Sequence, residues 1–227
     1  AQMPFVLGTT IHESDIDYLI DVDYELPSSP VHEPDERANK IGEIIASLYI
    51  HDGTTLQYGI GEVPEAVTKA IIKKGVKDLG IYTELFADAM RVLIQKGIVT
   101  NKYLRNNFSV ASIFLAASAE GYGWLDFNSS VQSRPSNLTN HVMYISSQPK
   151  MTAINSAIGV DLHGNIWADS LLARQIYSGI GGQADFLRGS YLAEDGAPII
   201  AMKSTTDNGL VKILDKCPEG ITTTAIA

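Results

Sequence analysis

The chain has 227 residues, 45% of them hydrophobic and 19% charged, which is an ordinary composition for a globular protein that buries one sizeable core. Its net charge of −9 argues against a nucleic-acid partner, and its apolar runs are too short for a membrane span. The opening residues lack a signal-peptide pattern, and the single cysteine, Cys217, cannot form an internal disulfide. We therefore expect a cytoplasmic protein without a membrane or nucleic-acid partner. Five scattered histidines and one cysteine predict no metal site.

The first half of the chain alternates strand and helix signals. Residues 1–34 carry few helix signals: the alternating stretch 11–23 predicts a strand, and prolines mark a linker. Apolar spacing then predicts helices and strands in turn. The predicted helices begin near residue 35, after Pro64 and at residue 86, and the predicted strands cover 54–58, 78–81 and 110–117. The last of these strands is an uninterrupted apolar run, which is typical of a strand buried on both faces.

The second half is richer in strand signals. The predicted strands cover 152–162, 165–169, 197–203, 210–214 and 221–224. Alternating strands and helices favour a parallel sheet, and the later strands suggest mixed pairing. The predicted fold class is therefore α/β, an open, mixed but mostly parallel sheet flanked by helices.

Glu84 is the first candidate for chemistry, because it lies just past the end of the strand predicted over 78–81. Open α/β sheets bind ligands outside the carboxyl ends of their strands. A carboxylate that is desolvated and held against an activated acyl group becomes a nucleophile. The alternative is that Glu84 only caps the helix predicted to begin near Phe86, where the helix dipole favours negative charge.

Two glycine-rich turns could supply backbone N–H donors. Gly59-Ile60-Gly61 stands between a strand and a helix start, and residues 177–186 carry three glycines in four positions. Such turns bind anions or stabilise an oxyanion, although many contact no ligand. Gln57 could offer its amide or satisfy a buried backbone group, and Lys203 could neutralise an anion or be a solvated strand-end lysine.

Taken together, four stretches resemble the acetyl-CoA hydrolase/transferase family, which includes acetate-, succinate-, butyrate- and 4-hydroxybutyrate-type CoA transferases. They are QYGIGEVPEAV, DLGIYTELFAD followed by GIVTNK, INSAIGVDLHGNIWADS, and YSGIGGQADFLRG, and they occur in this order between residues 57 and 189. The resemblance implies transfer of CoA between short-chain carboxylic acids, or hydrolysis of acyl-CoA. It also implies CoA as a substrate rather than a permanently bound cofactor, small carboxylates as partners, and a homodimer.

The resemblance assigns a role to each matched residue. Glu84 stands at the end of the D-L-G-I-x-T-E stretch, where the family has its catalytic glutamate, which forms an acyl anhydride and then a glutamyl-CoA thioester. The residues expected to contact CoA or form the oxyanion region are Gln57, Gly59, Ile60, Gly61, Glu62, Val63, Ser178, Gly179, Gly181, Gly182, Gln183 and Lys203.

The chain departs from the family pattern in several respects. Gly159 stands where the family usually has Glu, and Glu62 stands where a small residue is usual. An extra carboxylate near Glu84 would raise a carboxyl pKa by like-charge repulsion. Family members are much longer, so we expect 1–34 to be a linker or edge segment and 35–227 a catalytic domain truncated at its C-terminal end. The alternative to an enzyme is a non-catalytic CoA-binding or interaction module of the same fold.

Overall fold

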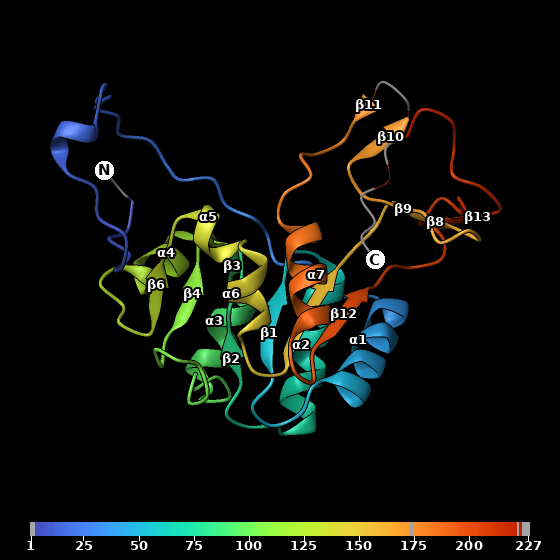
Figure 1. The fold of residues 1–227 in the computed structure, drawn as a ribbon, viewed down its shortest axis with the longest axis horizontal. Coiled ribbons are helices and arrows are strands. Elements are labelled where there is room, and N and C mark those ends of the chain that lie inside the picture. The colour runs from blue at the N-terminus through green and yellow to red at the C-terminus, as the bar shows by residue number, and fades with distance from the viewer. Residues whose placement is uncertain (1–2, 173–174, 222, 224–227) are drawn as a thin grey trace.

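A layer of parallel strands lies between two layers of helices in the computed structural model, which describes residues 3–172, 175–221 and 223 (Figure 1). The central sheet has the strand order β12-β7-β1-β2, and all of its pairs are parallel. Its strands are β1 (Thr55–Tyr58), β2 (Gly80–Ile81), β7 (Met151–Asn155) and β12 (Ala197–Ile200). The predicted α/β class with a mostly parallel sheet is confirmed.

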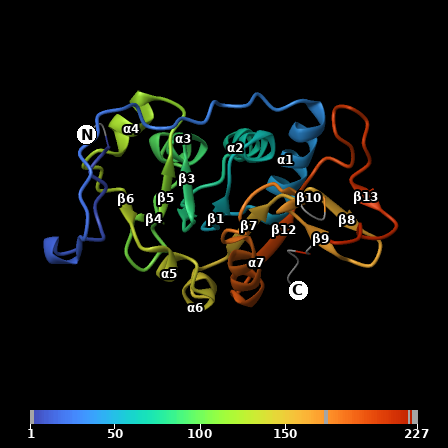
Figure 2. The same ribbon diagram turned by 90° about the horizontal axis from the view of Figure 1, so that it is seen from above.

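Beyond β2 the sheet continues through a parallel bridge between Tyr82 and Val110. That bridge leads to β4 (Ser109–Ala111), which pairs in parallel with β6 (Val131–Ser133). Figure 2 shows the two helical layers on either side. One face carries α1 (Glu36–Tyr49), α2 (Glu62–Lys74), α3 (Asp88–Gln95) and α4 (Ala119–Leu125), and the other carries α5 (Ser136–Thr139), α6 (Val142–Ser146) and α7 (Gln183–Leu192).

Local sequence signals set the boundaries of α1 and α2. The Asp35 side chain accepts a hydrogen bond from the Ala38 N–H and caps α1, which is the usual role of aspartate at that position. Gly75 ends α2 in the left-handed conformation that glycine adopts freely. The two helices pack closely because Gly42 has no side chain: a Cβ there would lie 2.5 Å from the Ala66 carbonyl carbon. Their apolar faces then cover the sheet and build the main core.

The predicted strand over 110–117 is wrong in one respect, because it is broken. After β4 the chain kinks at Ser112 and resumes as β5 (Ile113–Leu115), which pairs with β3 (Leu85–Ala87). The N–H groups of Ser112 and Ile113 both donate to the Glu84 carbonyl, and this shared acceptor interrupts the ladder. The helix predicted from residue 86 accordingly begins later, at the start of α3.

The predicted strand over 11–23 is also wrong. The only regular element there is a short 3-10 helix (Glu13–Asp15), and residues 11–23 are exposed throughout. A strand needs a partner for its backbone groups, and this stretch has none among the described residues. The N-terminal segment is tied down elsewhere, since Phe5 stacks on Phe127 with ring centroids 4.8 Å apart and the Tyr122 hydroxyl donates to the Pro27 carbonyl over 2.6 Å.

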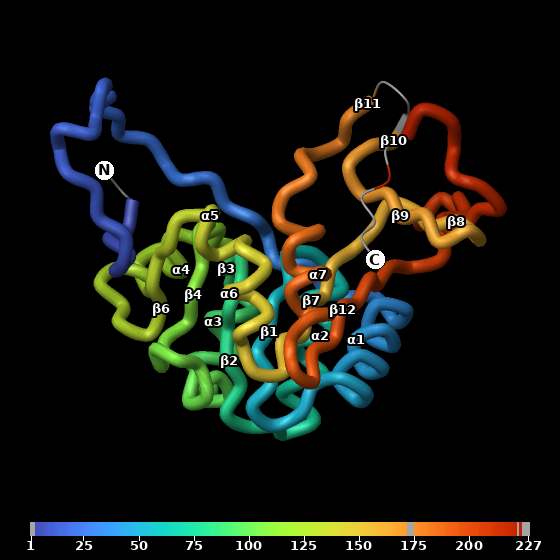
Figure 3. The backbone as a smooth tube through the Cα atoms, viewed as in Figure 1, coloured from blue at the N-terminus to red at the C-terminus, as the bar shows by residue number. Residues whose placement is uncertain are grey.

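Apart from β12, the strands that follow β7 form small sheets of their own, and Figure 3 traces their chain above and beside α7. The predicted strand over 152–162 divides into β7 and β8 (Gly159–Asp161), and β8 lies between β9 (Ile166–Trp167) and β13 (Ile213–Leu214). A separate hairpin consists of β10 (Ser170–Leu172) and β11 (Gln175–Ile176). In the predicted strand over 221–224, residues 222 and 224 lie outside the described residues, and residues 221 and 223 are not in a strand. Within the described chain, no helix has both the length and the apolar character that crossing a bilayer requires.

Candidate active site

Glu84 sits at the break between β2 and β3. Its carbonyl is held by the N–H groups of Ser112 and Ile113, at 3.0 and 2.8 Å, and the Thr83 N–H is fixed to the Val110 carbonyl. The backbone is therefore anchored on both sides of this residue. The side chain is half-buried. Three backbone hydrogen bonds thus aim the carboxylate out of the sheet at a fixed point.

The Glu84 carboxylate meets the N-terminus of α7. Its Oε2 accepts a hydrogen bond of 2.7 Å from the Gly182 N–H, across 98 residues of sequence. Gly182 allows this approach because a Cβ there would clash with Oε2 itself and lie 2.6 Å from the Asn140 amide nitrogen. The free N–H groups and dipole of a helix N-terminus stabilise negative charge. The proposed cap of a helix near Phe86 is wrong, because this carboxylate lies at the start of a different helix.

Two polar side chains, those of Asp185 and Asn140, lie near this contact, and Gln183 follows Gly182 in the chain; the sequence analysis did not single them out as a set. Asp185, in the first turn of α7, has its pKa raised by burial and then by the charge of Glu84. The Asn140 amide lies beside Gly182. The Nε2 of Gln183 is buried and has no hydrogen-bond partner among the described residues. A buried donor without a partner is costly, so it is a natural contact for a bound ligand. Asp185 could have been found from its place in the G-G-Q-A-D stretch; Asn140 carried no such signal.

The Gly59–Val63 turn lies at the carboxyl end of β1 and opens α2. Gly61 has a φ of 111°, a conformation that side chains with a Cβ rarely adopt. Nothing lies within 4 Å of a Cβ built on Gly59 or Gly61, so the backbone of the turn is open to a ligand. Ile60 is exposed above it. The one hydrogen bond to the Glu84 carboxylate among the described residues comes from Gly182, so the structure does not join this turn to Glu84 directly.

Gln57 is buried and paired. Its amide exchanges two hydrogen bonds with Asn155 on β7, of 3.0 and 3.4 Å. The pair links β1 to β7 just below the Gly59–Val63 turn. The interpretation that Gln57 satisfies a buried backbone group is wrong in its partner, because the amide pairs with the side chain of Asn155.

Lys203 lies beside the Gly59–Val63 turn, but it is already neutralised. Its ammonium contacts the Glu62 carboxylate and lies 2.9 Å from that of Asp35, and its side chain is only 14% exposed. Hydrogen bonds to Glu62 and then Asp35 raise the pKa of Lys203. Glu62 is thus engaged by this lysine. A cleft of about 340 Å³ opens here, lined by the turn, Lys203 and Lys212.

Of the remaining loop candidates, Gly181 lies beside Glu84, since a Cβ built on it would be 3.8 Å from the Glu84 Oε2. Among the described residues, no contact joins Ser178 or Gly179 to Glu84. Ser178, Gly179 and Gly181 are exposed, and the Ser178 hydroxyl bonds to the Gly179 carbonyl. Within the described residues, no cluster of three or more His, Cys, Asp or Glu side chains is arranged to hold a metal ion. The arrangement at Glu84 is that of a carboxylate held by a helix N-terminus, with an unpaired amide donor on the residue that follows Gly182.

Comparison with known proteins shows which family the chain belongs to. Residues 118–226 match the family described as acetyl-CoA hydrolase/transferase C-terminal domain. A succinyl-CoA:acetate/propanoyl-CoA:succinate CoA transferase from Fasciola hepatica is 37% identical over 98% of this chain and 47% of its own length. The 4-hydroxybutyrate coenzyme A transferase of Clostridium kluyveri is 36% identical over 92% of this chain and 48% of its own length. The chain belongs to the acetyl-CoA hydrolase/transferase family.

Solved structures show the same relationship. The acetyl-CoA hydrolase/transferase fold of this chain superimposes on RipA from Yersinia pestis with a TM-score of 0.86 and 33% identity, over 98% of this chain and 50% of that one. A 4-hydroxybutyrate CoA-transferase from Porphyromonas gingivalis gives a TM-score of 0.80 at 34% identity, over 95% of this chain and 51% of that one. The chain spans about half the length of the curated relatives it matches.

One departure from the family pattern has a clear structural basis. Gly159 on β8 faces Trp167 on β9 across an antiparallel pair, and the indole ring covers the glycine. A Cβ on Gly159 would lie 2.7 Å from the Cε2 of Trp167. The indole therefore fills the space that a longer side chain at position 159 would need.

Proposed function

We propose that this chain supplies the catalytic domain, residues 35–227, of an enzyme that transfers CoA between short-chain carboxylic acids or hydrolyses acyl-CoA. The observation that carries the proposal is the Glu84 carboxylate held by the Gly182 N–H at the N-terminus of α7. That position suits a group that must be anionic to attack, and whose carbonyl oxygen becomes an oxyanion when CoA attacks it. The relatives named above are CoA transferases, and this chain also matches the acetyl-CoA hydrolase of Kluyveromyces lactis at 25% identity, so both proposed activities occur among its relatives.

In the proposed mechanism, a Glu84 oxygen attacks the acyl-CoA carbonyl and expels CoA thiolate, which leaves an acyl–glutamyl anhydride. The thiolate then attacks the glutamyl carbonyl, releases the original carboxylate and forms a glutamyl-CoA thioester. An acceptor carboxylate runs the two steps in reverse and leaves as its own CoA thioester, while water instead releases free CoA. CoA is thus a substrate, and the chemistry is carried by the carboxylate.

The surrounding residues have distinct roles in this proposal. The Gly182 N–H, at 2.7 Å from Glu84, stabilises the carboxylate and then the oxyanion that forms on its carbonyl carbon. The unpaired Gln183 amide donates to the acyl carbonyl or to CoA. The open backbone of Gly59–Val63 receives the CoA chain, and Lys203 receives a CoA phosphate once it leaves Glu62. Ser178, Gly179 and Gly181 line the approach.

The test is CoA exchange between a labelled acyl-CoA and a free carboxylate, measured for Glu84→Gln against Glu43→Gln. Glutamine has the same shape but cannot form the anhydride, so Glu84→Gln loses exchange activity. Glu43 is a surface residue of α1 paired with Lys73, and its variant retains full activity. Near-normal turnover by Glu84→Gln contradicts the proposed nucleophile.

A non-catalytic CoA-binding module is the second candidate. Its basis is the two departures from the family pattern, Glu62 and Gly159. Calorimetry with CoA and the exchange assay separate the two, because a module binds CoA without exchanging acyl groups.

For the intact protein we further propose a cytoplasmic homodimer, since twofold symmetry is the commonest closed assembly, and light scattering tests it.

A further inference from the structure

A second cavity opens on the face of the sheet that carries α5 and α6. Its volume is about 480 Å³, which is within the range of small-molecule sites. Three stretches of chain line it: the ends of β2 and β4, the loop over 104–108, and the segment over 134–148. Neither Glu84 nor Gly182 is among its lining residues. The cavity therefore does not include the Glu84–Gly182 contact.

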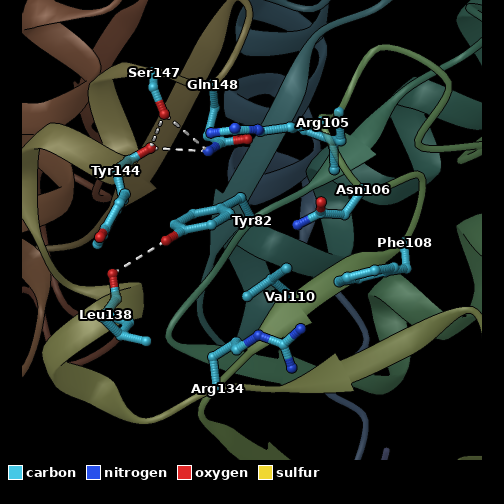
Figure 4. A pocket seen from close by; sticks show the side chains of 11 residues that line it. Tyr82, Arg105, Asn106, Phe108, Val110, Arg134, Leu138, Tyr144, Ser147 and Gln148 are labelled. Carbon is cyan, nitrogen blue, oxygen red and sulfur yellow. Dashed lines mark hydrogen bonds between the residues drawn. The ribbon is translucent and has the colours of Figure 1, made fainter. Parts of the chain in front are cut away.

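Two guanidinium groups face this cavity. Figure 4 shows Arg105 and Arg134 on opposite sides of the Tyr82 ring. Arg134 is half-buried and held in place by the Ser133 carbonyl at 2.8 Å and by Phe108, whose ring centroid is 5.5 Å from the guanidinium carbon. Arg105 has no hydrogen bond or ion pair among the described residues. One guanidinium is thus fixed in position and the other is free to close on a ligand.

No acidic side chain lines the cavity within the described part of the chain. The two arginines therefore have no carboxylate partner among the described residues that line the cavity, although the whole chain has a net charge of −9. Arginine forms paired hydrogen bonds with carboxylates and phosphates, and such bonds are stronger than those between neutral groups. The charge of the cavity therefore favours an anion that comes from outside it.

The floor between the two arginines is apolar. Tyr82 and Val110 form it, and burial followed by the neighbouring Tyr144 raises the pKa of Tyr82 to about 12, so its hydroxyl stays neutral and donates to the Leu138 carbonyl. Figure 4 shows Val110 beside the Tyr82 ring. An apolar floor between two cations matches a carbon skeleton with a negative charge at each end.

From this arrangement we propose that the cavity binds a small organic dianion, a short dicarboxylate, with one carboxylate on Arg105 and the other on Arg134. The carbon chain lies over Tyr82 and Val110. The site is distinct from the proposed CoA chemistry and binds its ligand whether or not that chemistry takes place.

The test is isothermal titration of the chain with succinate and adipate, with butyrate as the matched monoanion and inorganic phosphate as a second anion. The wild type binds a dicarboxylate saturably at millimolar concentration or below, and at least about tenfold more tightly than butyrate. Added salt weakens the binding, because the contact is between charges. Phosphate binding of equal strength with no dicarboxylate preference contradicts the dicarboxylate assignment.

Charge variants locate the site. Arg105→Gln and Arg134→Gln each weaken dicarboxylate binding at least about tenfold. Lys102→Gln removes the same charge three residues before Arg105, but Lys102 pairs with Asp78 and does not line the cavity, so binding is unchanged. If Arg134→Gln fails to fold, Arg105→Gln decides, since its side chain holds no other group. Absent binding, or binding that survives Arg105→Gln, overturns the proposal.

A variant at the active site separates this proposal from the proposed function. Glu84→Gln retains dicarboxylate binding, because Glu84 is outside the cavity. If Glu84→Gln weakens dicarboxylate binding and the two arginine variants do not, the ligand occupies the active site, and the second site does not exist.

Discussion

Releasing Lys203 from Glu62 should strengthen CoA binding. The Glu62→Gln variant keeps the shape of the side chain and removes its charge, so that the ammonium retains only Asp35 as a close partner. The Glu62 side chain is 36% exposed, which places the ion pair at the upper end of surface values, about 1 kcal/mol. In this variant, an incoming CoA phosphate does not have to displace the Glu62 carboxylate from Lys203 and is not repelled by its charge. We therefore expect CoA to bind about fivefold more tightly to Glu62→Gln.

The assay is calorimetric titration with CoA at constant ionic strength, with Asp207→Asn as the matched control. Asp207 also pairs with Lys203, but over 3.9 Å and with 79% of its side chain exposed, so its removal changes the affinity less than about twofold. Lys203 stays charged at neutral pH in both variants, since the ordinary pKa of lysine is far above 7 and Asp35, present in both variants, raises it further. Equal effects of the two substitutions, or weaker binding in Glu62→Gln, refute the idea that Glu62 competes with CoA for this lysine.

Two further predictions concern the β8–β9–β13 sheet. Gly159→Glu pushes against the indole of Trp167 and lowers the free energy of unfolding, measured by urea denaturation, by about 2 kcal/mol. In a Trp167→Ala background the same substitution lowers it much less, and equal losses in the two backgrounds contradict the packing argument. Burial alone would raise the pKa of Asp161, but hydrogen bonds from Asn165 and other donors outweigh it and lower the pKa to about 2. Because the pKa of Asp161 is higher in the unfolded chain, the stabilisation from its ionised form is complete above about pH 4 and is lost as the pH falls toward 2. In a Trp124→Phe variant, this loss exposes Trp167 and shifts the fluorescence of Trp167 to the red. An unchanged spectrum down to pH 2 contradicts it.

The sequence predicted those parts of the fold that depend on local signals. Apolar spacing and a capping aspartate placed α1 within two residues of its observed start, and β1 differs from its prediction by one residue. The prediction of one unbroken strand over 110–117 was wrong, because the kink at Ser112 depends on the carbonyl of Glu84, 28 residues earlier in the chain. No window of neighbouring residues carries that information.

The candidate site divides in the same way. Glu84 and the glycine turns could be named from their motifs, because their residue types suit acyl transfer. The contact that joins Glu84 to Gly182 spans 98 residues, and the capture of Lys203 by Glu62 depends on how α2 packs beside the end of β12. Both are tertiary contacts, so a sequence could suggest the members of the site but not their partners.

The most direct test of the account is the mass of the peptide that contains Glu84 after incubation with acyl-CoA. The account predicts a CoA thioester on Glu84, which borohydride reduces to the corresponding alcohol at that residue alone. It also predicts that the adduct is absent from Glu84→Gln. A protein that exchanges acyl groups at full rate while this peptide stays unmodified, or that carries the adduct on another residue, would contradict the central claim.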